Sequence, residues 1–210
     1  MTKKERTIAA VELLKAQYPD ALCSLEYDKP YELMIATRLS AQCTDARVNI
    51  VTRTLFKQFP TLQSFAEAEL TELEDAVKPC GFYKTKAKSI KEAAQRLLTV
   101  YGGEIPQTME ELLTLPGIGR KTANLLLGDL YGKPAVVTDT HFIRICGRLG
   151  LTKHTEPQKV EEDLRKLLPP KESSDFCHRI VLFGREFCKA RKPVCASCPL
   201  REICPSKDKQ

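Results

Sequence analysis

The segment Leu115–Asn124 combines two features that could bind a phosphate and present an amine to it. Gly117 and Gly119 lie in a short turn, where glycine lets backbone N–H groups converge on an anion. A helical pattern follows at once, and its positive end faces the same turn. Arg120 and Lys121 stand in the first turn of this expected helix, where the helix dipole disfavours cations. The pattern therefore predicts an anion bound beside the turn, or a lysine held as the neutral amine that acts as a nucleophile.

A carboxylate follows this lysine before the next helical pattern. Asp139 can cap that helix with one oxygen, which is its simplest interpretation. Capping and catalysis are compatible, because the second oxygen can still face a cleft. His141, just inside the helix, is interpreted as a hydrogen-bonded structural residue. A lysine amine, a carboxylate and a phosphate-binding turn are the parts of an enzyme that forms a Schiff base on DNA.

Four of the nine cysteines are clustered in the last part of the chain. Cys188, Cys195, Cys198 and Cys204 follow the spacing Cys-x6-Cys-x2-Cys-x5-Cys. Four thiolates in one loop can hold zinc or an iron–sulfur cluster, and a disulfide pair is a third alternative. The spacing favours the iron–sulfur cluster, because structural zinc commonly uses two Cys-x2-Cys pairs or histidines. This loop has one such pair and no histidine.

The cysteine loop is also basic. Lys189, Arg191 and Lys192 lie between its first two cysteines. The simplest interpretation is a solvated surface loop. The functional interpretation is a segment that contacts DNA phosphates, with an affinity that falls as the salt concentration rises.

Two further segments carry side chains that could enter a DNA duplex. Phe82 follows a glycine and precedes three lysines, so an exposed apolar tip there could wedge between stacked bases. An aromatic residue beside a glycine is more often a core residue next to a turn. Gln42 lies in the polar segment Ser40–Asp45 and could fill the gap left by an extruded base, although such a segment can equally serve as a helix cap.

The composition is that of a moderately basic globular protein. The 210 residues suffice for one large or two modest domains, and 33 basic against 27 acidic side chains give a net charge of +6. This excess permits a polyanionic partner without requiring one. No apolar run is long enough to cross a membrane and the first residues lack a signal-peptide core, so we expect a soluble, cytosolic protein. The remaining cysteines are interpreted as buried thiols: Cys23, Cys43, Cys80, Cys146 and Cys177.

Almost every segment has a helical pattern, and the sequence therefore predicts an all-α protein. The one strand-like run is Ala135–Val137. A long helix from about Lys84 is expected to end at Gly102 and Gly103. The expected helix start signals are Thr2, Pro30, Thr44 or Asp45, Thr71 with Glu74, Thr108 with Glu111, and Pro157.

These motifs together resemble the endonuclease III family, which are bifunctional DNA glycosylases of the helix-hairpin-helix superfamily. The resemblance covers nearly the whole chain, with the motifs in order and at matching separations. The hairpin alone would not be specific, whereas its combination with a downstream aspartate and a cysteine loop is. The motifs are Ser40–Asp45, Leu115–Asn124, Asp139–His141 and the four clustered cysteines.

The resemblance implies an all-α helix-hairpin-helix glycosylase fold with two domains. A six-helix barrel containing the hairpin would span residues 21–132, and residues 1–20 with 133–210 would form a domain that carries a 4Fe–4S cluster. The chain would cross between the domains near Gly132–Pro134. DNA would bind in the cleft between them.

The resemblance also assigns roles to residues. Lys121 would be the Schiff-base nucleophile and Asp139 the catalytic carboxylate. Gln42 and Phe82 would enter the duplex. The other DNA contacts would be Gly117, Gly119, Arg120, Lys189, Arg191 and Lys192, and the cluster ligands would be Cys188, Cys195, Cys198 and Cys204.

The implied activity is base-excision repair of oxidised pyrimidines in double-stranded DNA. The damaged base is flipped out of the stack, Lys121 displaces it at C1′, Asp139 stabilises the cationic sugar, and β-elimination cuts the strand 3′ to the abasic site. The implied partner is duplex DNA with damaged pyrimidines or abasic sites, bound by a monomer in a bacterial-type cytosol. The sequence departs from the family at Phe82, where many relatives have leucine, and at Thr138, where an aliphatic residue is usual.

Three alternatives remain open at this stage. A monofunctional glycosylase of the same fold, such as a mismatch adenine glycosylase, would lack the nucleophilic lysine and usually has a large C-terminal recognition domain. A non-catalytic module would use the hairpin only to grip DNA and would form no covalent adduct. A redox protein would explain the cysteines but would leave the hairpin without a purpose. The presence of both Lys121 and Asp139 favours the bifunctional enzyme.

Overall fold

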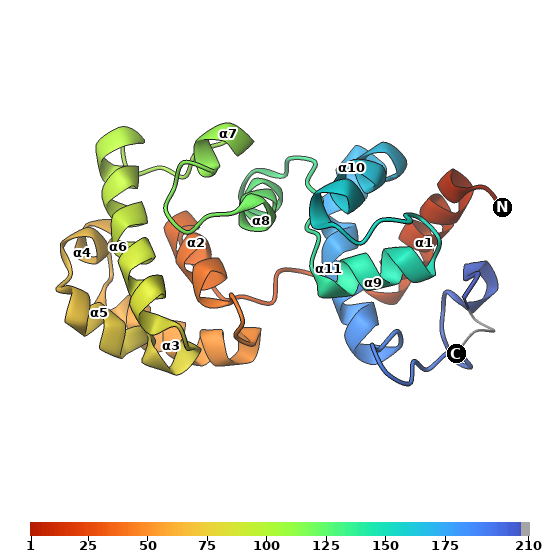
Figure 1. Cartoon of the computed structure of the whole chain (residues 1–210), viewed down its shortest axis with the longest axis horizontal. Helices are drawn as coiled ribbons and strands as arrows, with labels where there is room; N and C mark the ends of the chain where they lie inside the picture. Colours follow the sequence, from red (N-terminus) through yellow and green to blue (C-terminus); the bar gives the residue numbers. More distant parts are fainter. Residues whose placement is uncertain (207–210) are drawn as a thin grey trace. The chain divides into compact units, whose positions relative to one another are not determined.

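The computed structural model describes residues 1–206, and within them the regular secondary structure is helical, with no strand. The chain forms two compact units (Figure 1). We call Cys23–Tyr131 the inserted unit, and Met1–Leu22 together with Gly132–Gln210 the terminal unit. The barrel domain expected at 21–132 stays a prediction.

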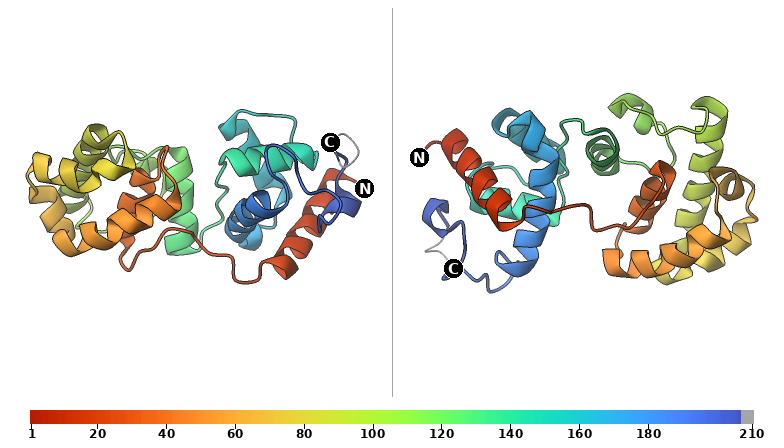
Figure 2. Two further views of the ribbon diagram at one scale, coloured as in Figure 1. Left: turned by 90° about the horizontal axis from the view of Figure 1, so that it is seen from below. Right: turned by 180° about the vertical axis from the view of Figure 1, so that it is seen from behind.

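The inserted unit is a helical bundle in which the long helix α6 packs along α4 and α5, while α2 packs against α3, α6 and α8 (Figures 1 and 2). Local signals start several of these helices. Pro30 is the first residue of α2, and the Thr44 hydroxyl accepts a hydrogen bond from the Arg47 amide at the start of α3. The elements are α2 Pro30–Leu39, α3 Asp45–Gln58, α4 Leu62–Glu67, α5 Leu70–Val77, the 3₁₀ turn η1 Lys78–Cys80, α6 Tyr83–Val100, α7 Met109–Leu112 and α8 Arg120–Tyr131.

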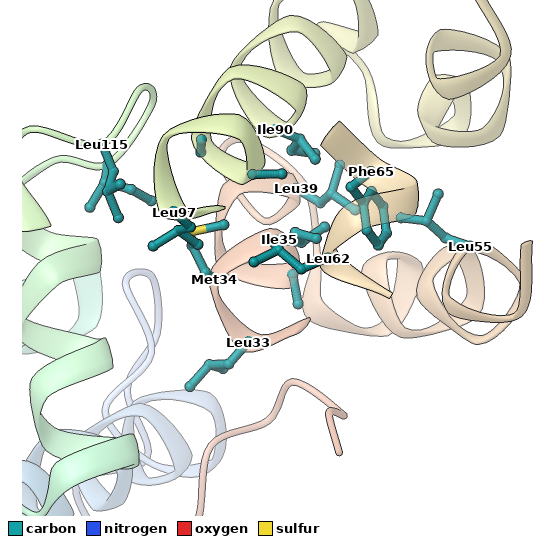
Figure 3. Packing of buried hydrophobic residues seen from close by; sticks show 14 of the residues in the cluster. Leu33, Met34, Ile35, Leu39, Leu55, Leu62, Phe65, Ile90, Leu97 and Leu115 are labelled. Carbon is teal, nitrogen blue, oxygen red and sulfur yellow. The ribbon is translucent and has the colours of Figure 1, made fainter. Parts of the chain in front are cut away.

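The core of the inserted unit surrounds α2. Leu33, Met34, Ile35 and Leu39 of this helix are buried among side chains of the neighbouring helices (Figure 3). An α-helix that is apolar on most of its faces must be surrounded in this way. Because α2 is enclosed, the position of its last residue, and of the segment Ser40–Asp45 that follows, is fixed by the core.

The terminal unit is built on α11, which packs against α1 and α9 (Figure 2). Phe142 of α9 and Phe176 of α11 are both fully buried and meet edge to face, with ring centroids 6.1 Å apart. At the start of α1, Thr2 and Glu5 form the reciprocal hydrogen bonds of a capping box. The elements are α1 Lys3–Gln17, α9 Thr140–Arg148, α10 Pro157–Leu167, η2 Pro170–Glu172, α11 Ser173–Glu186 and η3 Arg201–Ile203.

The one strand-like run of the sequence forms no strand, as the all-α prediction requires, whereas one expected helix start is wrong. Ala135–Val137 forms no strand: the Ala135 amide donates to the Ser173 hydroxyl, and the Val137 amide to the Cys177 sulfur. The side chains of α11 therefore replace a partner strand. Thr71 does not cap a helix, because α5 already begins at Leu70.

The cysteines outside the clustered group are free thiols, but they are not all buried. Cys80, Cys146 and Cys177 are buried as expected, whereas Cys23 and Cys43 are half-buried. Among the described residues, no helix is both long enough and apolar enough to span a lipid bilayer.

Candidate functional site

The turn that contains Gly117 and Gly119, which we call the glycine turn, is fixed by hydrogen bonds from α6 and the residue after it. Arg96 of that helix and Tyr101, the residue that follows it, both hydrogen-bond the hydroxyl of Thr114, at 3.1 and 2.8 Å. Leu115 and Ile118 are buried and anchor the turn in the core. The turn therefore joins α7 to α8 as a fixed hairpin.

The two glycines of this turn differ in whether the folded protein itself requires a residue without a Cβ. Gly117 has a φ of +79°, and a Cβ there would lie 2.6 Å from the Arg38 Nε and 2.9 Å from the Ser89 Cβ. Packing and backbone conformation thus both require glycine at this position. Gly119 has no positive φ, and a Cβ there would meet no atom within 4 Å. Only an external molecule that approaches the backbone would require glycine at Gly119.

Lys121 is the second residue of α8 and is exposed. Its side chain makes no hydrogen bond or ion pair with any residue that the structure describes. The first turn of an α-helix leaves several backbone N–H groups without intrahelical acceptors, and Gly119 O already receives the first helical bond, from the Ala123 amide at 2.9 Å. A primary amine and a set of anion-binding amides therefore share one end of α8.

Asp139 caps α9, as its position in the sequence predicted. Its Oδ1 accepts a hydrogen bond of 2.7 Å from the Phe142 amide, and the residue is half-buried. His141, next to it, is a structural residue: its Nδ1 lies 3.1 Å from an Arg144 guanidinium nitrogen, and its ring is close enough to Gly184 of α11 to exclude a Cβ there. Asp139 belongs to the terminal unit and Lys121 to the inserted unit.

Three of the predicted DNA contacts have an unusual backbone. Gln42, Phe82 and Lys192 have φ values of 56°, 48° and 50°, and they are the only non-glycine residues with positive φ in the described part of the chain. This conformation costs free energy in residues with a Cβ and concentrates at functional sites. All three side chains are exposed, and Phe82 has 66% of its surface accessible. An exposed aromatic side chain on strained backbone has no folding role that would explain it.

The four clustered cysteines line one cavity, together with apolar side chains that include Phe183 and Leu200. Burial above all, and then charge on the neighbouring cysteines, raises the pKa of the Cys198 and Cys204 thiols. Four thiolates here would repel one another unless a cationic group lay between them. The cavity therefore fits an iron–sulfur group by the chemistry of its donors.

The arrangement of these thiols also bears on the alternatives. All are free, which excludes the disulfide pair. In a 4Fe–4S cluster each thiolate binds a different iron, so four thiols that line one cavity can all serve as ligands.

Arg148 fixes the basic loop between the first two cysteines. Its guanidinium donates to the carbonyls of Lys189 and Ala190, at 2.7 and 3.1 Å, and to the Cys188 sulfur at 3.3 Å. Arg148 ends α9, the helix that Asp139 begins. One helix therefore connects the candidate catalytic carboxylate with the loop that carries Lys189, Arg191 and Lys192.

Two supporting residues were not found from the sequence. Arg38 is half-buried beneath Gly117, and its Nε donates to the Ser89 hydroxyl at 2.7 Å. A lone cation in the apolar pattern of α2 was a signal for it. Lys86 is buried and donates to two backbone carbonyls. Nothing in the sequence distinguished Lys86 from the exposed lysines around it.

Comparison with protein families identifies both regions. Residues 35–170 match the model of the HhH-GPD superfamily base excision DNA repair proteins. Residues 188–204 match the iron–sulfur binding domain of endonuclease III. The first match contains the glycine turn and Asp139, and the second begins and ends at the outer cysteines of the cluster.

Individual relatives cover the whole chain. Endonuclease III of Synechocystis sp. is 47% identical over 206 residues, which is 98% of this chain and 94% of the relative. A solved structure of endonuclease III in a non-covalent complex with DNA superposes with a TM-score of 0.93 at 40% identity, covering 100% of this chain and 98% of the other. A trapped covalent endonuclease III–DNA intermediate superposes with the same TM-score and identity, covering 100% and 99%.

Proposed function

The chain belongs to the endonuclease III family, and from this premise we propose that Lys121 and Asp139 carry out its chemistry on DNA. Members of this family are base-excision DNA glycosylases with abasic-site lyase activity, and this chain is such an enzyme with a 4Fe–4S cluster. The observation that carries the assignment of Lys121 is its exposed, unpaired amine in the first turn of α8, directly after the glycine turn.

The first step is displacement of the base. The Lys121 Nζ, as the neutral amine, forms a bond to C1′ while the bond between C1′ and the base nitrogen breaks. The electron pair leaves with the base, which takes up a proton. Opening of the sugar ring at the C1′–O4′ bond then gives an iminium ion between Lys121 and the sugar.

The second step cuts the strand. Removal of a proton from C2′ sends electrons toward the C3′–O bond, which breaks and releases the strand on the 3′ side with its phosphate. Water then hydrolyses the imine and returns the free lysine. Asp139 stabilises the cationic sugar and relays protons, because one carboxylate oxygen caps α9 and the other stays available.

The DNA contacts follow from the positions of the exposed residues. The backbone at Gly117, Gly119 and Arg120 receives a phosphate at the start of α8. Gln42 and Phe82 enter the duplex, where Phe82 wedges between bases and Gln42 occupies the gap left by the flipped nucleotide. The strained backbone at both residues supports this assignment.

The cluster region adds a second contact with the DNA backbone. Cys188, Cys195, Cys198 and Cys204 would hold the 4Fe–4S cluster, which would cross-link the loop. The exposed cations of the basic loop then contact phosphates: Lys189, Arg191 and Lys192.

The finer properties are proposals as well. We assign oxidised pyrimidines as the damaged bases, and a monomer in the cytosol as the working form. The proposed domain division is residues 21–132 for the barrel domain that contains the hairpin, and residues 1–20 with 133–210 for the cluster domain.

The test is incubation with a duplex that contains one dihydrothymine, followed by analysis of the strand with and without alkali. A bifunctional enzyme leaves a cut strand without alkali, ending in an unsaturated aldehyde. A strand that is cut only after alkali would show excision without lyase activity and would support the monofunctional alternative. Binding with neither product would support the non-catalytic module.

A further inference from the structure

Lys86 joins the two segments that carry the duplex-entering side chains. It lies in the first turn of α6 and has only 1% of its surface exposed. Its Nζ donates hydrogen bonds of 2.8 Å to the carbonyl of Leu39 and 2.8 Å to the carbonyl of Cys80. Gln42 follows Leu39 closely in sequence, and Phe82 follows Cys80. One ammonium group therefore ties together the starting points of both segments.

The two acceptors are carbonyls at the ends of helical elements. Leu39 is the last residue of α2, and Cys80 is the last residue of η1. Carbonyls at such ends have no donor within their own helix and carry the negative end of its dipole. A buried cation is favourable at this position, since it satisfies both carbonyls at once.

The backbone of Lys86 adds a further restraint. Its amide donates to the carbonyl of Phe82 at 3.0 Å, so Phe82 lies between two hydrogen bonds made by one residue. The turn at Gln42 is closed by the Cys43 amide, which donates to the Ser40 carbonyl at 3.1 Å. Both strained residues thus sit in short loops whose ends are fixed.

A buried charge at Lys86 destabilises the fold through desolvation of the ammonium group. Burial lowers the pKa of its ammonium, and no described carboxylate forms an ion pair with it. An apolar side chain of similar length would fill the space without that desolvation cost. What such a side chain could not do is hold two carbonyls at one point, and left-handed backbone persists only where the surroundings determine it.

We propose that Lys86 is a positioning residue that sets Gln42 and Phe82 at the spacing needed to enter the duplex together. This inference rests on the proposed roles of those two side chains. Lys86 itself is buried and does not touch the DNA.

Lys91 provides a matched control on the same helix. Its Nζ also donates to a backbone carbonyl, that of Ala68 between α4 and α5, at 2.6 Å. Lys91→Met removes a similar lysine–carbonyl bond without touching either segment. A purely structural role for Lys86 predicts the same consequences for the two variants after their stabilities are matched by temperature.

The experiment compares Lys86→Met and Lys91→Met in two assays. The first is the single-turnover rate of dihydrothymine excision relative to the rate of β-elimination at a preformed abasic site. The second is the fluorescence of 2-aminopurine placed opposite an abasic site, which reports unstacking and needs no excision. We expect Lys86→Met to lower the rate ratio roughly ten- to hundredfold, the scale of a misplaced positioning group, and to lose the fluorescence increase. Lys91→Met should retain both.

A double variant with Phe82→Ala separates the positioning role of Lys86 from its contribution to stability. In a Phe82→Ala background, Lys86→Met should lower excision much less than in the unaltered chain, because contacting residues are not additive. If Lys86→Met does not fold, Lys86→Arg replaces it, since a guanidinium cannot place one nitrogen between both carbonyls.

Equal effects of Lys86→Met and Lys91→Met on the rate ratio and on the fluorescence would overturn the inference. Full additivity with Phe82→Ala would overturn it as well. Failure of the unaltered chain to excise any base would contradict the proposed function instead, and the fluorescence comparison on the abasic duplex would still decide the role of Lys86.

Discussion

At the scale of single residues, strain and exposure coincide at three of the positions that the sequence assigned to DNA. Gln42, Phe82 and Lys192 adopt left-handed backbone and present their side chains to solvent. A folded chain keeps such conformations only where neighbouring structure enforces them. In Gln42 and Phe82 the enforcement comes from Lys86, and for Lys192 the loop is held by Arg148.

The two glycines of the turn should respond differently to alanine. Gly117→Ala should destabilise the protein by about 1–3 kcal/mol, because its φ is positive and its Cβ would meet Arg38. Gly119→Ala should leave the melting temperature nearly unchanged. It should weaken binding to an abasic-site duplex about three- to tenfold, the value of roughly one hydrogen bond. Thermal unfolding and a binding titration measure the two effects.

Within this pair, Gly119→Ala tests the contact with DNA separately from the packing that Gly117→Ala disturbs. Gly119→Ala shows whether the exposed glycine serves the DNA, since nothing in the protein occupies the space of its Cβ. Unchanged DNA affinity in Gly119→Ala would mean that no phosphate approaches this backbone.

Capping and catalysis by Asp139 can be separated by one substitution. Asparagine caps helices about as well as aspartate, so Asp139→Asn should retain the melting temperature. The loss of the negative charge should lower the excision rate by roughly a hundredfold or more. Asp139→Ala should lose about 1 kcal/mol of stability in addition. Full activity of Asp139→Asn in a single-turnover assay would restrict this residue to its structural role.

At the scale of elements, capping residues and first-turn prolines predicted where helices start. They did not predict which distant segments would hydrogen-bond to one another. Thr2, Pro30 and Thr44 begin helices because caps and first-turn prolines act within a few residues. Ala135–Val137 has strand-forming side chains, but its amides bond to α11, a partner far away in the sequence. The segment therefore has extended backbone without a strand.

The same limit applies to the candidate site. The glycine turn, Lys121 and the cysteines are continuous motifs, so the sequence identified them as candidates. Lys86 and Arg38 act through carbonyls and hydroxyls of other helices, which only the folded chain brings near them. The supporting residues of a site are therefore less visible in a sequence than its chemical groups.

The docking of α1 onto α11 should depend on pH through Glu172. Lys15 of α1 first, and then Arg179 of α11, hold the pKa of this carboxyl below its ordinary value. A lowered pKa in the folded state stabilises the protein above the ordinary glutamate pKa, and this contribution is lost as the pH falls through the lowered value. Glu172→Gln should cost roughly 1.5–3 kcal/mol near neutral pH, because Arg179 is buried.

Thermal unfolding of this variant and the unaltered chain, from about pH 7 to about pH 3.5, measures the effect. The difference in melting temperature should shrink toward the acid end. Glu156→Gln is the control, because its ion pair with Lys159 is exposed on both sides and should contribute little. A difference that stays constant with pH would contradict the proposed role of the Glu172 charge.

At the scale of the whole molecule, the chain folds as two units although the catalytic assignments need both. The terminal unit contains residues from both ends of the chain, with α1 packed against α11. Asp139, the cysteines and the basic loop belong to it, while Lys121, Gln42 and Phe82 belong to the inserted unit. The proposed assignments therefore require both units to contact one stretch of DNA.

The central claim is that Lys121 forms a covalent imine with the sugar, and borohydride trapping tests it most directly. The enzyme is incubated with a dihydrothymine duplex and reduced with borohydride, and the adduct is digested and located by mass spectrometry. Lys166→Ala, which removes an exposed lysine of α10, is the matched control for Lys121→Ala. We predict a stable protein–DNA adduct on Lys121 in the unaltered chain and in Lys166→Ala, and none in Lys121→Ala. An undiminished adduct in Lys121→Ala, or an adduct located on another residue, would contradict the account.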